Sequence, residues 1–285
     1  MKTHISLRFY GSCVVAGTLL FLIMMVALHL LRPDYNPLRN FMSEYLVGPF
    51  SFLGTVAAYV LSATLLLLMA GLWIGVRPCG FLTASCILIG VVIISVCVSA
   101  IFPIDPLPPD GRLPNFTTAG IIHVIFAVPL FGSLIALLLT LPSAYKRDEK
   151  WRSASHVTLL LGFLTLASFV GCFLAPFYLR GLAQRATILP VLVWLLLTGL
   201  RLRQAIPESF VRAVLLFVTT ATFVIFVAAG VLRILSSLTT PLKTDPYLYW
   251  SAVVLCFAVG TFSFWRGSIE LLTYFRERKM ESSLE

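Results

Sequence analysis

Four ionisable side chains with the chemistry of an acid-base site stand at the ends of long apolar runs in this chain. Glu44 and Asp105 supply carboxylates, His123 supplies an imidazole and Arg185 supplies a guanidinium group. A carboxylate in a partly apolar cavity tends to have a raised pKa, while a neighbouring arginine keeps another carboxylate ionised. We therefore expect Glu44, Asp105 and His123 to act as acid and base. The residues that we expect to bind a substrate are Ser43, Asn40, Arg185 and Arg233.

Each of these four side chains also has a purely structural interpretation. Glu44 lies just ahead of an apolar run, where a carboxylate stabilises the positive end of a helix dipole. His123 stands one to two turns inside another run, where a hydrogen bond to a neighbouring helix satisfies the ring. Arg185 either extends to lipid phosphates or forms a fork-shaped pair with Glu44 or Asp105. The sequence alone leaves the catalytic and the structural interpretation open.

The composition indicates an integral membrane protein. Hydrophobic residues make up 59% of the chain and charged residues 12%, and the mean hydropathy is +0.97. A spanning helix needs about 20 mostly apolar residues, whereas a barrel strand needs roughly 10. We therefore predict an all-α, polytopic transmembrane helical bundle. Its eight predicted spans are Phe9–Leu31, Phe52–Val76, Phe81–Ile101, Thr118–Leu141, Val157–Leu179, Ala186–Leu200, Val211–Leu235 and Tyr247–Trp265.

The distribution of basic residues predicts the orientation of the bundle. Most of the 21 Lys and Arg residues fall in connections on one side, which the positive-inside rule makes cytoplasmic. Both termini are then cytoplasmic, as an even number of spans requires, and the first run is a retained signal anchor. We expect a multi-pass protein of the inner membrane, with Glu44, Asp105, His123 and Arg185 on its outer side.

Few residues suit a metal or another cofactor, and we predict no cofactor. A zinc site made of His29, His123, Asp105 and Glu44 is a weaker alternative, because zinc needs three or four ligands and no His-x-x-x-His pair occurs. The six cysteines have no paired spacing. The net charge of +9 suits anionic lipid headgroups, so we expect membrane lipids and an amphipathic small molecule as partners, and no nucleic acid.

Four short motifs, in this order and spacing, resemble a family of prokaryotic membrane proteins. They are Ser43-Glu44, Phe102-Pro103-Ile104-Asp105, the Gly120-x-x-His123 step and Gly181-Leu182-x-x-Arg185. Together they resemble the domain-of-unknown-function 998 family. The resemblance covers about residues 9–204 and implies a six-helix core with an outer polar cluster, but no reaction. Residues 205–265 then add two helices, and residues 266–285 form a charged cytoplasmic tail.

These observations favour a one-sided site at the outer face of the bundle. We expect a pocket that acts on or binds a lipid-like molecule, with acid-base catalysis as one possibility. The chain also resembles, more loosely, the membrane hydrolases that include alkaline ceramidases. It lacks the several histidines with which those enzymes bind zinc. The alternative is a binding, transport or accessory protein in which the polar cluster is an interhelical staple. A staple predicts that all four ionisable groups are paired, whereas an active site predicts at least one unsatisfied group.

Overall fold

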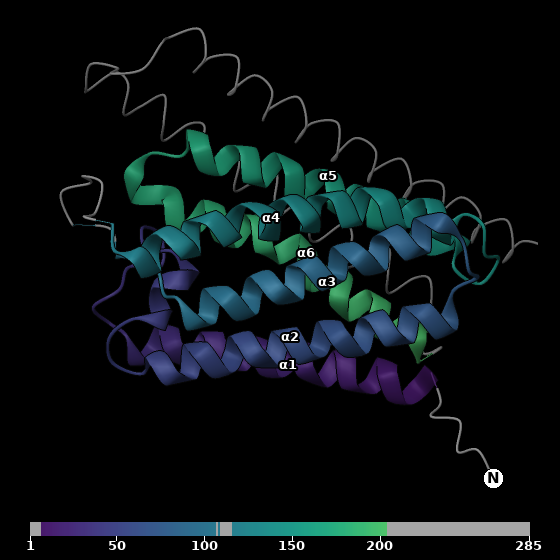
Figure 1. Cartoon of the computed structure of the whole chain (residues 1–285), viewed down its shortest axis with the longest axis horizontal. Coiled ribbons are helices and arrows are strands. Elements are labelled where there is room, and N and C mark those ends of the chain that lie inside the picture. Colours follow the sequence, from purple (N-terminus) through teal and green to yellow (C-terminus); the bar gives the residue numbers. More distant parts are fainter. Residues whose placement is uncertain (1–6, 107, 109–115, 204–285) are drawn as a thin grey trace, which may run out of the picture.

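The computed structural model describes residues 7–106, 108 and 116–203, and this part of the chain is helical without strands (Figure 1). Two short 3-10 helices, η1 and η2, lie in the connections. The helices are α1 Leu7–Leu31, η1 Met42–Leu46, α2 Ser51–Gly75, α3 Gly80–Ile101, α4 Thr118–Tyr145, α5 Arg152–Leu174, η2 Phe177–Leu179 and α6 Arg180–Leu202.

Six of the described helices are long and apolar enough to cross a membrane, and their lengths run from 22 to 28 residues. The protein is therefore a multi-pass membrane protein, and the first six predicted spans are confirmed as helices. The predicted spans at 211–235 and 247–265 and the tail at 266–285 lie outside the described residues. The total of eight spans, the position of both termini and the choice of the inner membrane stay predictions.

The boundary between the fifth and sixth helices differs from the prediction. The expected fifth span continued to Leu179, but α5 ends at Leu174, and Ala175 adopts an extended conformation before Pro176. Proline disfavours the helical conformation of the residue before it and removes a donor, so the helix stops there. The chain resumes as η2 and continues into α6 at Arg180, so Arg185 lies inside a helix rather than before it.

Each helix packs against its neighbours in the sequence, and α6 packs back against α1 as well as α5. Consecutive helices run in opposite directions (Figure 1). The α1–α2, α3–α4 and α5–α6 connections therefore lie at one end of the bundle, on the left in Figure 1. We call this the Glu44 end, because Glu44, Asp105, His123 and Arg185 all belong to it.

Small residues let the helices approach one another closely. Gly11 of α1 faces the backbone of Gly199 in α6, and Gly17 faces Thr64 of α2. The hydroxyls of Thr18 and Thr64 donate to carbonyls one turn earlier in their own helices, so they add no unsatisfied donor to the apolar core. Close packing of this kind drives helix association where the lipid is as apolar as the protein interior. The result is a rigid support for the connections at the Glu44 end.

Candidate functional site

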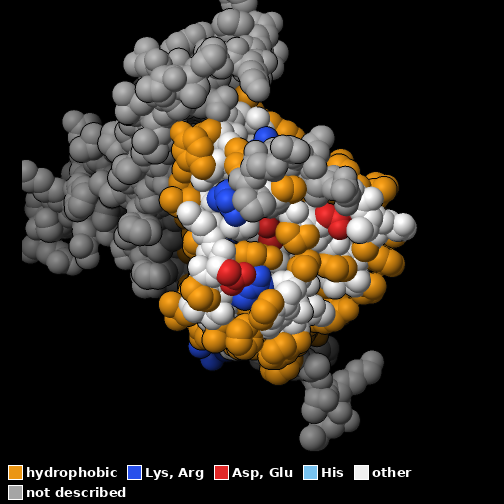
Figure 2. Space-filling model, turned by 90° about the vertical axis from the view of Figure 1, so that its left-hand side faces the viewer, with side chains coloured by type: hydrophobic (Ala, Val, Ile, Leu, Met, Phe, Trp, Pro, Cys, Tyr) orange, Lys and Arg blue, Asp and Glu red, His pale blue; other side chains and the backbone are white. Residues whose placement is uncertain are grey.

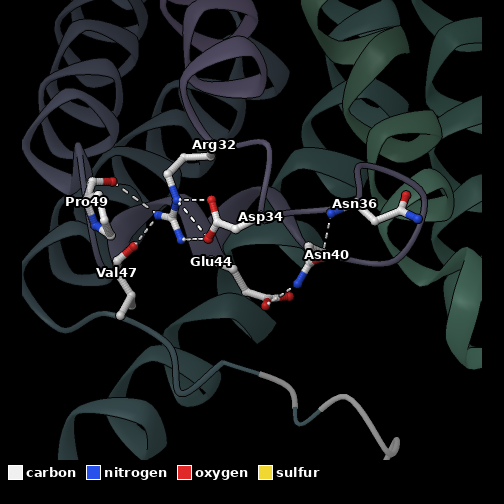
Figure 3. Close-up of polar contacts among 7 residues, drawn as sticks. All are labelled: Arg32, Asp34, Asn36, Asn40, Glu44, Val47 and Pro49. Atoms are coloured by element: carbon white, nitrogen blue, oxygen red, sulfur yellow. Dashed lines mark hydrogen bonds and ion pairs between the residues drawn. The ribbon is translucent and has the colours of Figure 1, made fainter.

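Glu44 is a buried carboxylate that organises the connection between α1 and α2. It lies in η1, and none of its side chain is exposed. Its Oε1 accepts a hydrogen bond from the backbone N–H of Phe41 at 2.7 Å, and its Oε2 accepts one from Asn40 Nδ2 at 2.8 Å. The Asn40 side-chain oxygen accepts in turn from the N–H of Asn36 at 2.9 Å (Figure 3). Both carboxylate oxygens are therefore used to fold the loop.

Arg185 connects this loop to α6 and to α1. Its Nη1 donates to the backbone oxygens of Asn40 at 2.8 Å and Gly181 at 3.0 Å. Its Nε and Nη2 lie 3.1 Å and 2.9 Å from His29 Nε2. Nδ1 of His29 is hydrogen bonded to the carbonyl of Met25, so a neutral ring with its proton on Nδ1 satisfies both sides. The guanidinium thus joins three segments that are distant in sequence.

Of the two alternatives for Arg185, the fork-shaped pair with Glu44 or Asp105 does not occur in the described part of the chain. Within the residues that the structure describes, the one ion pair joins Arg32 to Asp34. Arg185 and Glu44 are instead linked through Asn40, whose backbone oxygen accepts from the arginine while its side chain donates to the carboxylate. Backbone carbonyls and the His29 ring accept the hydrogen bonds of this guanidinium, and the sequence carries no sign of which acceptors it will meet.

The same loop is fastened to the first turns of α6 by further contacts. The N–H of Leu182 donates to the carbonyl of Leu38 at 3.0 Å, and the N–H of Met42 donates to Gln184 Oε1 at 2.6 Å. Gly181 leaves the necessary room, because a Cβ atom there would lie 2.7 Å from the carbonyl oxygen of Pro37. The position of the loop thus depends on α6, which follows it by about 140 residues.

The rings of Tyr35 and Tyr45 in the loop pack together, and Tyr45 also packs against His29 of α1. The ring of Tyr45 stands 5.0 Å from that of His29 and 5.4 Å from that of Tyr35, and the guanidinium of Arg32 lies 3.8 Å above Tyr35. The hydroxyl of Tyr45 is buried and has no hydrogen-bond partner among the described residues. Burial raises the pKa of Tyr45, so its hydroxyl stays protonated.

Arg32 closes the other side of the loop and was not among the predicted site residues. It pairs with Asp34 at 2.7 Å, and its Nη1 donates to the carbonyls of Val47 at 2.7 Å and Pro49 at 3.1 Å (Figure 3). Its hydrogen bond to Asp34 raises the pKa of Arg32, and the same bond lowers the pKa of Asp34. The guanidinium also covers Gly48, whose φ of 78° suits glycine.

Asp105 caps α4. Its two oxygens accept from the backbone N–H and the hydroxyl of Thr117, at 2.8 Å and 2.9 Å. Thr117 is the N-cap of α4, and its side-chain oxygen accepts from the N–H of Gly120 at 3.1 Å. A Cβ atom at Gly120 would lie 2.6 Å from Cγ of Asp105, so a larger residue there would displace the carboxylate. The carboxylate lies where it complements the positive end of the helix dipole.

His123 caps the C-terminal end of α3, next to the start of α4. It is buried, and its Nδ1 lies 2.9 Å from the carbonyl oxygen of Phe102 and 3.2 Å from that of Ser99. The last carbonyls of a helix have no partner within the helix, and a histidine N–H satisfies them here. His123 therefore joins α4 to the end of α3, which is the structural interpretation that the sequence left open.

The structure thus divides the predicted site residues into two groups at the Glu44 end. One group binds the α1–α2 loop to α6, and the other joins α3 to α4 through caps. Ser43 lies in η1 beside Glu44 and is partly exposed, and Arg233 lies outside the described residues. Among the described residues, no three His, Cys, Asp or Glu side chains group so as to hold a metal ion, so His29, His123, Asp105 and Glu44 do not form the zinc site considered as an alternative.

A comparison with protein families supports the resemblance seen in the sequence. The model of a family described as protein of unknown function (DUF998) matches residues 15–201, which is more than half of the chain. The chain belongs to the DUF998 family. No curated protein and no solved structure matches it. The part shared with other DUF998 proteins includes both groups of site residues, from His29 to Arg185.

Several residues of this DUF998 site escaped the sequence analysis. His29 was considered only as a metal ligand, and the chain gave little reason to select Gln184 or Tyr45. The ion pair of Arg32 and Asp34 could have been predicted, because an arginine and an aspartate on either side of a proline are close enough to pair. Figure 2 looks onto the Glu44 end and shows basic and acidic side chains among hydrophobic ones.

Proposed function

We propose that this DUF998 protein binds an amphipathic, lipid-like molecule at the Glu44 end without transforming it chemically. The observation that carries the proposal is the way in which the four predicted catalytic groups are used. Glu44 and Asp105 each accept through both oxygens, His123 caps α3, and Arg185 is bonded to carbonyls and to His29. Because these four groups are already hydrogen bonded within the protein, acid-base catalysis is the less favoured alternative.

Positive charge at the same end supports binding of a molecule with a polar head. Arg39 of the loop and Arg180 at the start of α6 are both partly exposed, and neither has a carboxylate within 4.0 Å in the described part of the chain. Basic side chains on the outer side run against the usual charge preference of membrane proteins, so they require a reason to be there. Recognition of an anionic headgroup supplies one.

A comparison of lipid and metabolite profiles tests the proposal. Cells would carry the wild-type protein, a deletion, or one of the variants Glu44→Gln, Asp105→Asn and His123→Gln, and the abundance and thermal stability of each protein would be measured in parallel. We expect any change of profile to follow the loss of folded protein. A variant with normal abundance and stability but the profile of the deletion would show that the replaced group is catalytic, and would overturn the binding proposal.

A further inference from the structure

We propose that the molecule bound at the Glu44 end carries a phosphate group, and that Arg39 and Arg180 hold this group beside the ring of Phe177. This inference rests on the proposed function and names the class of its ligand. It draws on residues that take no part in the buried polar network around Glu44.

The two guanidinium groups share one aromatic ring. The Cζ atom of Arg39 lies 5.9 Å from the centroid of Phe177, and that of Arg180 lies 5.7 Å from it. Cation–π attraction at these distances contributes about 0.5–1 kcal/mol at exposed sites. Both guanidinium groups thus lie within 6 Å of the same ring, and neither has an acidic partner among the described residues.

Arg39 has an additional sign of a missing partner. Its Nε atom is buried, and no acceptor lies within hydrogen-bonding distance in the described part of the chain. An unsatisfied buried donor costs about 1–3 kcal/mol, and more when the group is charged. Folded proteins therefore leave few such groups without a ligand or an ordered water. Because protein atoms cover this Nε atom, an anion would bind the same guanidinium through its two Nη groups.

Both arginines are attached to segments that the structure holds firmly. Arg39 lies between Leu38 and Asn40, whose carbonyls accept from Leu182 and Arg185 of α6. Arg180 is the first residue of α6, where the helix dipole favours an anion. The site is therefore largely formed before the ligand binds, which lowers the entropic cost of binding.

A phosphate on a lipid fits these surroundings better than a soluble ion does. Guanidinium groups bind phosphate through paired N–H donors, and lipid phosphates lie at the level of helix ends. Apolar surface for the tail lies close by in the sequence, because Phe173 in the last turn of α5 is 75% exposed and Tyr178 of η2 is 46% exposed. Phe173 also stacks edge-on against Phe169, which continues the aromatic surface along α5.

Binding of defined lipids to the purified full-length protein tests the inference. Native mass spectrometry would measure retention of dioleoyl phosphatidic acid, dioleoylglycerol and inorganic phosphate by the wild type and by an Arg39→Gln/Arg180→Gln variant. The control, Arg77→Gln/Arg152→Gln, removes the same charge at the opposite end of the bundle. We expect phosphatidic acid to bind best, and its affinity to fall at least ~10-fold in the first variant but not in the control.

Each other outcome has a definite meaning. Equal binding of dioleoylglycerol, unaffected by the first variant, would overturn the phosphate inference and leave the proposed function standing. Tight binding of inorganic phosphate alone, lost in that variant, would support the site but contradict a lipid ligand. Binding of none of the three would overturn both. If the glutamine variant unfolds, Arg39→Lys/Arg180→Lys keeps both positive charges but removes the paired N–H donors of the guanidinium groups. Unchanged binding of phosphatidic acid by that variant would refute the role of the paired donors.

Discussion

Replacing Gly181 by alanine is the sharpest test of how the α1–α2 loop is held against α6. The added Cβ atom would lie 2.7 Å from the carbonyl oxygen of Pro37 and 2.9 Å from the carbonyl carbon of Arg39, with the Asn40 oxygen closer still. All three atoms belong to the backbone, so no rotation of a side chain relieves the contact. Either the loop or the first turn of α6 has to move.

The expected cost follows from the contacts that such a movement disturbs. Overpacking of this kind costs about 1–3 kcal/mol. A displaced loop also weakens the hydrogen bonds from Leu182 to Leu38 and from Arg185 to Asn40, each contributing about 1 kcal/mol. Alanine has a better helix propensity than glycine, which returns at most about 1 kcal/mol. We therefore expect a net destabilisation of about 2–4 kcal/mol.

Thermal unfolding of the purified protein in detergent measures this loss. At roughly 2–4 °C per kcal/mol, Gly181→Ala should lower Tm by at least about 4 °C. The matched control is Gly90→Ala in the middle of α3, because a Cβ atom there meets nothing within 4 Å. The control should be as stable as the wild type or more stable. If Gly181→Ala unfolds at the same temperature as Gly90→Ala, the loop does not depend on that close approach.

Three further predictions concern the buried polar groups and the loop. Glu44→Gln should lose about 1–3 kcal/mol of stability, measured by the same thermal unfolding, since one of two N–H donors then faces an amide NH₂ group. Tyr145→Phe should be neutral or stabilising, because the buried hydroxyl has no partner among the described residues, and a clear fall in Tm would contradict this. The lowered pKa of Asp34 means that its pairing with Arg32 stabilises the fold above the ordinary pKa of 3.8 and is lost as pH falls through the folded value. Unfolding below about pH 5 should therefore become less pH-dependent in Asp34→Asn, and an unchanged profile would show that the pair does not stabilise the loop.

The helices could be predicted because their lengths obey one simple constraint. An apolar run that crosses a bilayer must be a helix of about 20 residues or more, and this places most boundaries within a few residues. The start of α6 was misplaced because a short 3-10 turn and a helical Arg180–Arg185 segment interrupt the apolar pattern. Hydropathy alone does not distinguish a polar first turn from a loop.

The sequence analysis selected four residues that the structure places at one end of the bundle, but it did not predict what they contact. Glu44, Asp105, His123 and Arg185 do gather at one end of the bundle, since alternate connections of antiparallel helices must do so. Their partners are mostly backbone groups, as in the caps that Asp105 and His123 form. Backbone carbonyls and N–H groups occur at every position, so the sequence gives no indication of which of them a charged side chain will find.

The hydrogen bond from Met42 to Gln184 has a consequence for synthesis in the cell. It joins residues 142 positions apart, so at 5–20 residues per second the ribosome completes the partner of the first loop roughly 7–28 s after the loop itself. During this interval Glu44 and Asn40 lack the arginine that completes their network. The first connection therefore gains its hydrogen bonds to α6 only after the ribosome has made α6, so the last of the six described helices completes the structure of the first loop.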